Sequence, residues 1–140
     1  MSPGDRKDKA QQLLRACDLG DAEAAATLIN DDFTFQFMEK AETWTVDGQE
    51  VSTKLDKATF LQYGLGAADQ VTSNKRFNFT FDLAVSEGDH VMILGTSDAV
   101  SLKGEPYRNN YVWYVRFSGD DISELREYTD TKHAHDVLFD

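Results

Sequence analysis

The chain has 140 residues, of which 41% are hydrophobic and 11% aromatic, and its formal net charge is −11. Such a chain is expected to form one globular domain, 1–140, that buries roughly 70% of its unfolded surface. Acids predominate and the 14 Lys and Arg residues are scattered. The sequence therefore argues against a nucleic acid or an anionic membrane surface as partner.

Cys17, the single cysteine, lies inside an apolar helical pattern and is interpreted as a small buried core residue. A lone cysteine excludes an intrachain disulfide and fits a reducing compartment. No run approaches the roughly 20 apolar residues of a membrane span, and the opening MSPGDRKDK lacks the apolar stretch of a signal peptide. We therefore expect a cytoplasmic protein with no membrane partner.

The first thirty residues predict two short helices. The first, 5–20, places on one face Ala10, Leu13, Leu14 and Cys17. Gly20 is expected to end it, and Asp21 to cap the second helix, 21–30. The inner stripe of that second helix consists of Ala25, Leu28 and Ile29.

Period-two alternation then predicts a strand over 32–39, with Phe33, Phe35 and Phe37 on one face. A short strand, 42–46, follows and turns at Asp47 and Gly48. The segment 56–68 returns to a helical pattern capped by Asp56, and its glycines predict a frayed C-terminal end.

From Lys75 onward the sequence reads as four long strands joined by the short turns SEGD, KGEP and SGDD. The first strand is expected to place on one face Phe77, Phe79, Phe81, Leu83 and Val85. Short connections force neighbouring strands to pair, which predicts an antiparallel meander. The tail, 129–140, is expected to close as a short helix.

This order of elements predicts an α+β fold: a conical, curved antiparallel sheet, covered on one face by the N-terminal helices, with a short C-terminal helix. A strongly bent sheet covered on one side leaves a cavity, which is the natural ligand site in so small a domain.

Glu127 is the first candidate for chemistry, because alternation in the last strand places it beside Leu125 and Thr129. If that face is the covered one, apolar surroundings raise the carboxyl pKa, as a general acid or base requires. Alternatively, Glu127 is exposed and pairs across strands with Arg116 or Arg108. Asp130 has a simpler interpretation: it follows the strand and caps the tail helix.

Asp98 is the second unusual acid, because it lies within an otherwise apolar strand and shares parity with Met92, Leu94 and Thr96. It either faces the cavity, where a second carboxyl would separate acid and base roles, or is a solvated residue near a strand end. The aromatic residues Trp44, Tyr63, Tyr111 and Trp113 are candidates for the pocket wall, with core packing as the alternative.

Other chemistries lack a signature in the sequence. His133 and His135 are two residues apart, unlike the spacing of a zinc helix, so no metal site is expected. There is no nucleophile elbow and no phosphate-binding glycine loop, and no cofactor is expected.

The element order and the segment YRNNYVWYVRFSGDDISELREYTD resemble the nuclear transport factor 2-like superfamily, and within it the SnoaL-like and ketosteroid-isomerase-like proteins. In SnoaL-like polyketide cyclases and limonene epoxide hydrolase, the acid at the position of Glu127 looks like the catalytic one, here lengthened from Asp to Glu. The second Asp of the hydrolase would fall on Asp98. Members of the superfamily commonly dimerise through the open sheet face, which implies a homodimer.

The departures from this resemblance narrow the expected chemistry. Thr96 stands where the hydrolase has an Arg, and Phe35 and Phe37 stand where it holds water with Tyr and Asn. Epoxide hydrolysis by that route is therefore not expected. We expect acid–base chemistry, as an isomerase, cyclase or lyase, on a small apolar or polyketide-like ligand, with Glu127 and Asp98 as catalytic residues. Phe35, Phe37, Trp44, Tyr63, Tyr111 and Trp113 would bind the substrate. The alternative is a non-catalytic ligand-binding or assembly module of the same fold.

Overall fold

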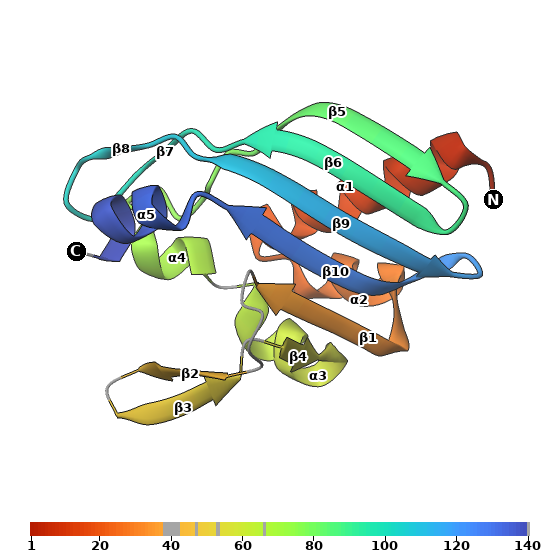
Figure 1. Ribbon diagram of the computed structural model, residues 1–140, viewed down its shortest axis with the longest axis horizontal. Coiled ribbons are helices and arrows are strands. Elements are labelled where there is room, and N and C mark those ends of the chain that lie inside the picture. Colours follow the sequence, from red (N-terminus) through yellow and green to blue (C-terminus); the bar gives the residue numbers. More distant parts are fainter. Residues whose placement is uncertain (38–42, 47, 53, 66, 140) are drawn as a thin grey trace.

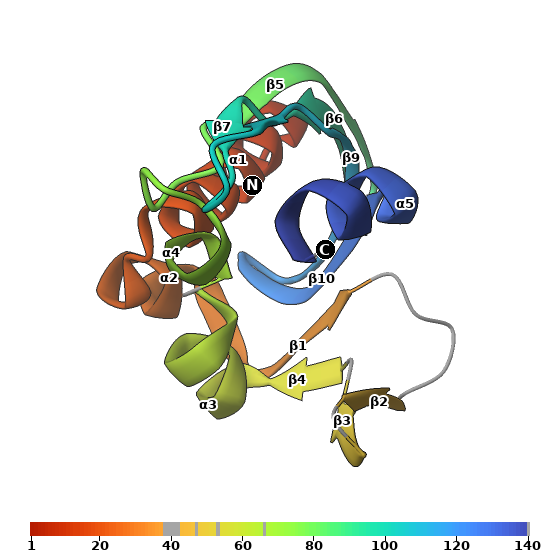
Figure 2. The same cartoon turned by 90° about the vertical axis from the view of Figure 1, so that its left-hand side faces the viewer.

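The computed structural model describes residues 1–37, 43–46, 48–52, 54–65 and 67–139, and for residues 43–46, 51 and 52 it describes the backbone alone. Helices pack against one side of a curved sheet, and the short C-terminal helical segment lies at one end of that sheet (Figures 1 and 2). The α+β class expected from the sequence is confirmed.

The two N-terminal helices begin and end where their caps predict. Helix α1 (Pro3–Leu19) starts with a capping box between Ser2 and Asp5, and Gly20 ends it in the left-handed conformation with φ of 67°. Helix α2 (Ala22–Leu28) starts at Asp21, whose side chain accepts a hydrogen bond from the Ala24 N–H. The chain then passes directly into the first strand.

The main sheet has six strands in the order β4–β1–β10–β9–β6–β5. These are β1 (Ile29–Phe37), β4 (Lys54–Asp56), β5 (Thr80–Glu87), β6 (His90–Thr96), β9 (Asn110–Ser118) and β10 (Asp121–Thr129). The predicted antiparallel meander is present as β5, β6, β9 and β10. Strand β1, however, lies parallel to β10, so the sheet is mixed. No hairpin links these two strands, and nothing therefore constrains them to run in opposite directions.

Two small hairpins lie outside the main sheet. One consists of β2 (Thr43–Val46) and β3 (Gln49–Ser52), and the other of β7 (Ala99–Val100) and β8 (Pro106–Tyr107). Gly48 occupies the turn of the first hairpin with φ of 79°, while Asp47, predicted to share that turn, lies outside the described residues.

The helix expected over 56–68 is divided into separate pieces. Asp56 caps α3 (Lys57–Thr59) as predicted, but the chain then widens into a π-helical turn, η1 (Phe60–Gly64). A Cβ atom on Gly64 would lie 2.8 Å from the Phe60 ring, so the glycine lets that ring pack against the backbone. A second helix, α4 (Ala67–Val71), follows in place of the predicted frayed end.

A bulge in β5 changes which side chains face the core. The pairing with β6 shifts between Phe81 and Leu83, and beyond it Leu83 and Val85 are exposed while Ala84 is partly buried. The prediction that Leu83 and Val85 share a face with Phe77 to Phe81 is therefore wrong. The extra residue of a bulge reverses the alternation for the rest of the strand.

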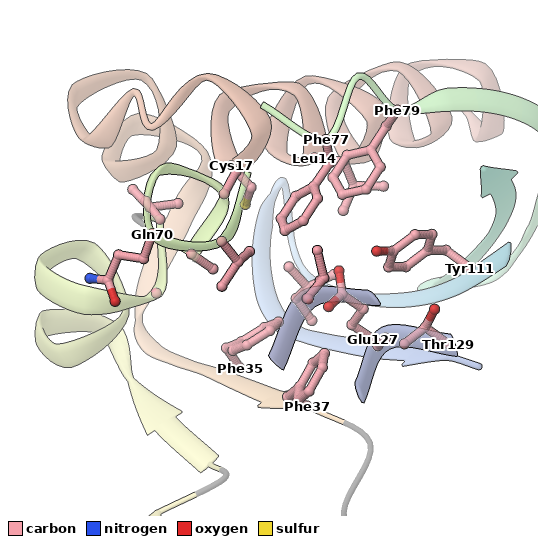
Figure 3. Close-up of a pocket in the computed structure, with 18 of the residues that line it drawn as sticks. Leu14, Cys17, Phe35, Phe37, Gln70, Phe77, Phe79, Tyr111, Glu127 and Thr129 are labelled. Atoms are coloured by element: carbon pink, nitrogen blue, oxygen red, sulfur yellow. The ribbon is translucent and has the colours of Figure 1, made fainter. Parts of the chain in front are cut away.

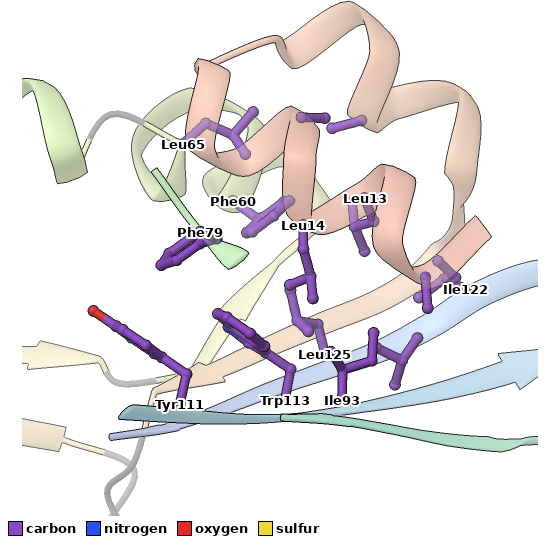
Figure 4. Close-up of a cluster of buried hydrophobic side chains, with 14 of the residues drawn as sticks. Leu13, Leu14, Phe60, Leu65, Phe79, Ile93, Tyr111, Trp113, Ile122 and Leu125 are labelled. Carbon is purple, nitrogen blue, oxygen red and sulfur yellow. The ribbon is translucent and has the colours of Figure 1, made fainter. Parts of the chain in front are cut away.

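The core lies between α1 and the concave face of the sheet (Figure 4). Leu13 and Leu14 of α1 meet side chains of alternate strand residues, which include Ile93, Trp113, Val115, Ile122 and Leu125. Trp113 is fully buried. Burial of such side chains is worth about 1.5–3 kcal/mol each.

The tail folds over one end of the sheet as α5 (Thr131–Ala134) and the π-helical turn η2 (His135–Phe139) (Figure 2). The predicted cap is confirmed, because the Asp130 side chain accepts hydrogen bonds from the Lys132 and His133 N–H groups. Asp130 thus starts the tail helix, while Glu127 lies three residues earlier, within β10.

Candidate functional site

A cavity of about 320 Å³ lies between the concave face of the sheet and the helices. Helix α1 contributes Leu14 and Cys17, strand β1 contributes Phe35 and Phe37, and β10 contributes Leu125, Glu127 and Thr129 (Figure 3). Further walls come from Phe77, Phe79, Tyr107, Tyr111, Leu138 and Phe139. The volume falls within the usual range for small-molecule sites.

Glu127 carries a largely enclosed, partly buried carboxyl group in this cavity. Its Oε1 atom accepts a hydrogen bond of 2.8 Å from Nε1 of Trp113, the residue opposite it on β9. Burial raises the pKa of Glu127 to about 7, while the bond from Trp113 acts in the lowering direction. Near neutral pH this carboxyl can therefore hold or accept a proton, as an acid–base catalyst must.

Two tyrosine hydroxyl groups line the cavity as a hydrogen-bonded pair. The Tyr107 and Tyr111 oxygens are 2.7 Å apart, and Nδ2 of Asn109 donates to the Tyr107 hydroxyl at 2.9 Å. Burial, followed by the nearby charge of Glu127, raises the pKa of Tyr111 above its ordinary value. Burial also raises the pKa of Tyr107. Both hydroxyls therefore remain protonated at neutral pH.

The lining carries one acid and no cation. Among the residues described around the cavity, Glu127 is the only carboxylate, and none is Lys, Arg or His. A bound carboxylate or phosphate would lose its hydration without gaining a counter-charge. The cavity therefore favours ligands without negative charge.

Asp18 holds one wall of the cavity in place. Its buried carboxylate accepts backbone hydrogen bonds from Phe77, Asn78 and Phe79 at 2.7, 3.3 and 3.2 Å. Asn78 has φ of 54°, which turns these N–H groups toward one acceptor. The Phe77 and Phe79 rings then stack 5.4 Å apart beside the cavity.

The structure brings together most of the residues singled out from the sequence. Glu127, Phe35, Phe37 and Tyr111 line the cavity, and Tyr63 lies at its rim with 67% of its surface exposed. Trp113 lies in the core and contacts Glu127 instead of contributing to the described cavity lining. The side chain of Trp44 lies outside the described part of the chain.

Asp98 does not belong to this site, so the expectation that it faces the cavity is wrong. Strand β6 ends at Thr96, and the Asp98 side chain is 72% exposed and pairs with Arg108 at 3.2 Å. Its parity partners Met92 and Leu94 are exposed on the outer face. The apolar pattern suggested a continuous strand, but the chain leaves the sheet when the Ser97 N–H bonds to the Asn109 carbonyl.

Sequence reasoning missed Tyr107 and Asn109. The segment that begins at Tyr107 was expected to form a strand, and residues 107, 109 and 111 share one parity. Extending the inward face of Tyr111 back along the chain would have found both residues. Tyr107, at the end of β8, lines the cavity, and Asn109, which lies between β8 and β9, contacts the Tyr107 hydroxyl from outside the described lining.

Other classes of site are not evident in the described residues. In that part of the chain, no group of three or more His, Cys, Asp or Glu side chains is arranged to hold a metal ion. No helix in it is long and apolar enough to span a membrane.

The fold is that of nuclear transport factor 2-like and ketosteroid-isomerase-like proteins, although the sequence matches no protein-family model and has no significant match among curated proteins. TerC co-crystallised with polyporic acid superposes with a TM-score of 0.77 at 13% identity, covering 97% of this chain and 99% of TerC. A nuclear transport factor 2-like protein of unknown function from Burkholderia pseudomallei gives a TM-score of 0.75 at 12% identity, with both chains fully covered.

A protein with a ketosteroid-isomerase-like fold from Catenulispora acidiphila, in complex with trimethylamine, gives a TM-score of 0.69 at 14% identity. The superposition covers 93% of this chain and 91% of that one. At these identities the comparisons establish the shared fold, and the chemistry has to be argued from the site itself.

Proposed function

We propose that this protein is an enzyme that uses Glu127 as a general acid and base on a small, largely apolar, uncharged molecule. The observation that carries this proposal is the Glu127 carboxyl, which lies in an apolar cavity and has its pKa raised to about 7 by burial. Acid–base catalysis is most efficient when the pKa of the group lies near the working pH.

The chemistry that fits this arrangement is proton transfer next to a carbonyl group. The Glu127 carboxylate removes a proton from the carbon beside the carbonyl, the electron pair of the C–H bond forms a carbon–carbon double bond, and the π pair of the carbonyl moves onto its oxygen. The Tyr111 hydroxyl donates a hydrogen bond to that oxygen as negative charge develops. Glu127 then returns the proton to a carbon of the enolate, which completes an isomerisation or prepares ring closure or elimination.

The lining supports a neutral, ring-containing substrate. Aromatic side chains from several parts of the chain face the cavity, including Phe35, Phe77 and Tyr111 (Figure 3). Two proteins of the same fold were crystallised with small organic ligands, polyporic acid and trimethylamine. A polyketide-like ring compound with a ketone group is the substrate class proposed here.

The second candidate is a non-catalytic module that binds a small ligand. It is favoured by the exposed position of Asp98, which leaves Glu127 as the only carboxylate in the described lining. In this case the Glu127 carboxyl only sets the polarity of the cavity.

Deuterium exchange distinguishes the two candidates. The protein is incubated in D₂O with a panel of neutral aryl ketones that fit the cavity, and exchange at the carbon beside the carbonyl is followed by mass spectrometry. Glu127→Gln should abolish exchange, while Glu124→Gln, on the opposite face of the same strand, should retain it. Protein-dependent exchange that survives Glu127→Gln would rule out this role.

A homodimer in the cytoplasm completes the proposal. The outer sheet face exposes the apolar side chains Leu83, Val85, Met92, Leu94 and Tyr128. Exposed apolar patches of this kind are typical of interaction surfaces. The single Cys17 is a free thiol, which agrees with a reducing compartment.

A further inference from the structure

We infer that Asn109 is a positioning residue that fixes the direction of a hydrogen-bond relay from Asn109 through Tyr107 to Tyr111, so that the Tyr111 proton points into the cavity. The inference rests on the proposed role of Tyr111 as donor to a substrate oxygen. It adds the reason why Tyr111 can play that role. The reason is the side chain of Asn109, which is not part of the described cavity lining.

The amide of Asn109 can take only one orientation. Its Nδ2 donates to the Tyr107 hydroxyl at 2.9 Å and to the Asp130 carbonyl at 2.9 Å, and its Oδ1 accepts from the Asn110 N–H at 2.8 Å. Rotating the amide by half a turn would set a donor against the Asn110 N–H and an acceptor against the Asp130 carbonyl. The bonds to Asp130 and Asn110 would both fail, since each of those backbone groups has a fixed role, and this fixes Asn109 as a donor to Tyr107.

The direction of the next bond follows from this orientation. The Tyr107 oxygen already accepts a hydrogen bond from Asn109, and its own proton is then available for the Tyr111 oxygen 2.7 Å away. In the proposed direction Tyr107 gives this one proton to Tyr111, so Tyr111 accepts from Tyr107 and keeps its own proton for the cavity. Each bond of such a chain polarises the next, which makes Tyr111 a stronger donor.

The free proton of Tyr111 lies where a ligand can use it. Tyr111 pairs with Thr129 in the sheet and is therefore diagonal to Glu127 on the same inward face. Figure 3 shows the Tyr111 hydroxyl and the Glu127 carboxyl directed into one space. The cavity thus presents an oriented O–H donor beside a proton-accepting carboxylate, which selects a ligand with an acceptor oxygen at this point.

Infrared spectroscopy of a bound ketone tests the relay without turnover. The probe is 2-acetylnaphthalene with a ¹³C-labelled carbonyl, and 2-isopropenylnaphthalene, which has no acceptor oxygen, is the matched control ligand. In the wild-type protein the carbonyl band should shift to lower frequency, and Tyr111→Phe should remove this shift. Tyr111→Phe should also weaken ketone binding about 3- to 10-fold while leaving binding of the control ligand unchanged.

Substitution of Asn109 tests its positioning role. The carboxylate introduced by Asn109→Asp can only accept from Tyr107, which turns the relay round and draws the Tyr111 proton away from the cavity. The carbonyl shift should then disappear as it does in Tyr111→Phe. A folded Asn109→Asp protein that keeps the full shift would overturn the inference.

If the Asn109 variant does not fold, Tyr107→Phe tests the direction of the hydrogen bond between Tyr107 and Tyr111. In the proposed direction, loss of the Tyr107 hydroxyl removes the bond that polarises Tyr111, and the carbonyl shift becomes smaller. In the opposite direction, the same change would release the Tyr111 proton and make the shift larger. Glu127→Gln should leave the shift in place, so a failed relay and a failed acid–base role give different results.

Discussion

Gly95 lies directly against the indole ring of Trp113. A Cβ atom on Gly95 would be 2.7 Å from Cζ3 of Trp113 and would also collide with the carbonyl oxygen of Thr80. Side chains cannot approach so closely without a shift of their neighbours. The position of the indole, and with it the hydrogen bond to Glu127, therefore depends on the absence of a side chain at residue 95.

Gly95→Ala should accordingly lower the free energy of unfolding by about 1–3 kcal/mol. It should also displace the indole N–H resonance of Trp113, because the bond to Glu127 lengthens. Urea unfolding and a ¹H–¹⁵N spectrum measure the two effects. Gly4→Ala is the matched control: its new Cβ would lie 3.8 Å from Ser2 Oγ, and stability should be unchanged or slightly higher.

Glu127 should make stability depend on pH in a defined direction. Burial raises its pKa from 4.5 to about 7, so the folded protein binds this proton more tightly than the unfolded chain. The contribution of this proton to the free energy of unfolding is therefore fully present below pH 4.5. It is lost as the pH rises to about 7 and is absent above that pH. The free energy of unfolding of Glu127→Gln should exceed that of wild type by at most about 3 kcal/mol at pH 8 and should equal it at pH 4.

Glu124→Gln should show the opposite behaviour in the same urea experiment. Burial alone would raise the pKa of Glu124, but hydrogen bonds from Arg126 and Arg116 outweigh burial and lower it. Its stabilising contribution is present above its unfolded pKa and is lost as the pH falls through its folded pKa. This variant should therefore be less stable than wild type at pH 8. Equal pH profiles for the two variants would contradict the burial of Glu127.

Trp113→Phe should raise the pKa of Glu127 above its value of about 7, because the indole bond acts in the lowering direction. Carbon-13 NMR of the side-chain carboxyls measures this directly. Glu124 serves as the internal reference, since it lies on the other face of β10 and should titrate as before. A Glu127 pKa that falls or does not move would show that the bond has no influence on its proton.

Asp18→Asn should destabilise the protein by about 2–3 kcal/mol, because hydrogen bonds from the Phe77 and Phe79 N–H groups to a buried carboxylate become weaker or are lost. Differential scanning calorimetry gives the change. Asp21→Asn is the control, because asparagine caps a helix as well as aspartate does. Similar melting temperatures for both variants would show that Asp18 does not brace the cavity wall.

The proposed homodimer predicts that Leu94→Lys, on the outer face of β6, produces a monomer without unfolding the protein. The introduced charge would have to be buried in the interface, which is costly. Sedimentation equilibrium at micromolar concentration should show a dimer for wild type and a monomer for the variant. Leu102→Lys, at a more exposed leucine outside the main sheet, should remain a dimer.

The sequence predicted those parts of the fold that are governed by local chemistry. Helix caps at Asp21, Asp56 and Asp130 depend on one side chain and its nearest backbone N–H groups, and all three are present. Alternation also grouped Glu127 with Leu125 and Thr129 on one face of the last strand, although it left open whether that face was the covered one. These predictions needed no knowledge of distant neighbours.

Features that depend on distant partners were not predictable in this way. The bulge after Phe81 arises from the pairing of β5 with β6, and the exit of the chain at Ser97 depends on bonds to Asn109. In the sequence, apolar alternation continues past Phe81. Asp98 was therefore expected in the cavity, whereas its side chain is exposed outside it.

The parallel pairing of β1 with β10 has a consequence for how the protein is made. Phe35 and Phe37 pair with Leu125 and Glu127, which are synthesised much later, so one side of the cavity lacks its neighbour until β10 has been made. Contacts between such distant parts of a chain form slowly, and a nascent chain that lacks its final strand exposes apolar rings. The ligand site should consequently form only after the segment that carries β10 has been synthesised.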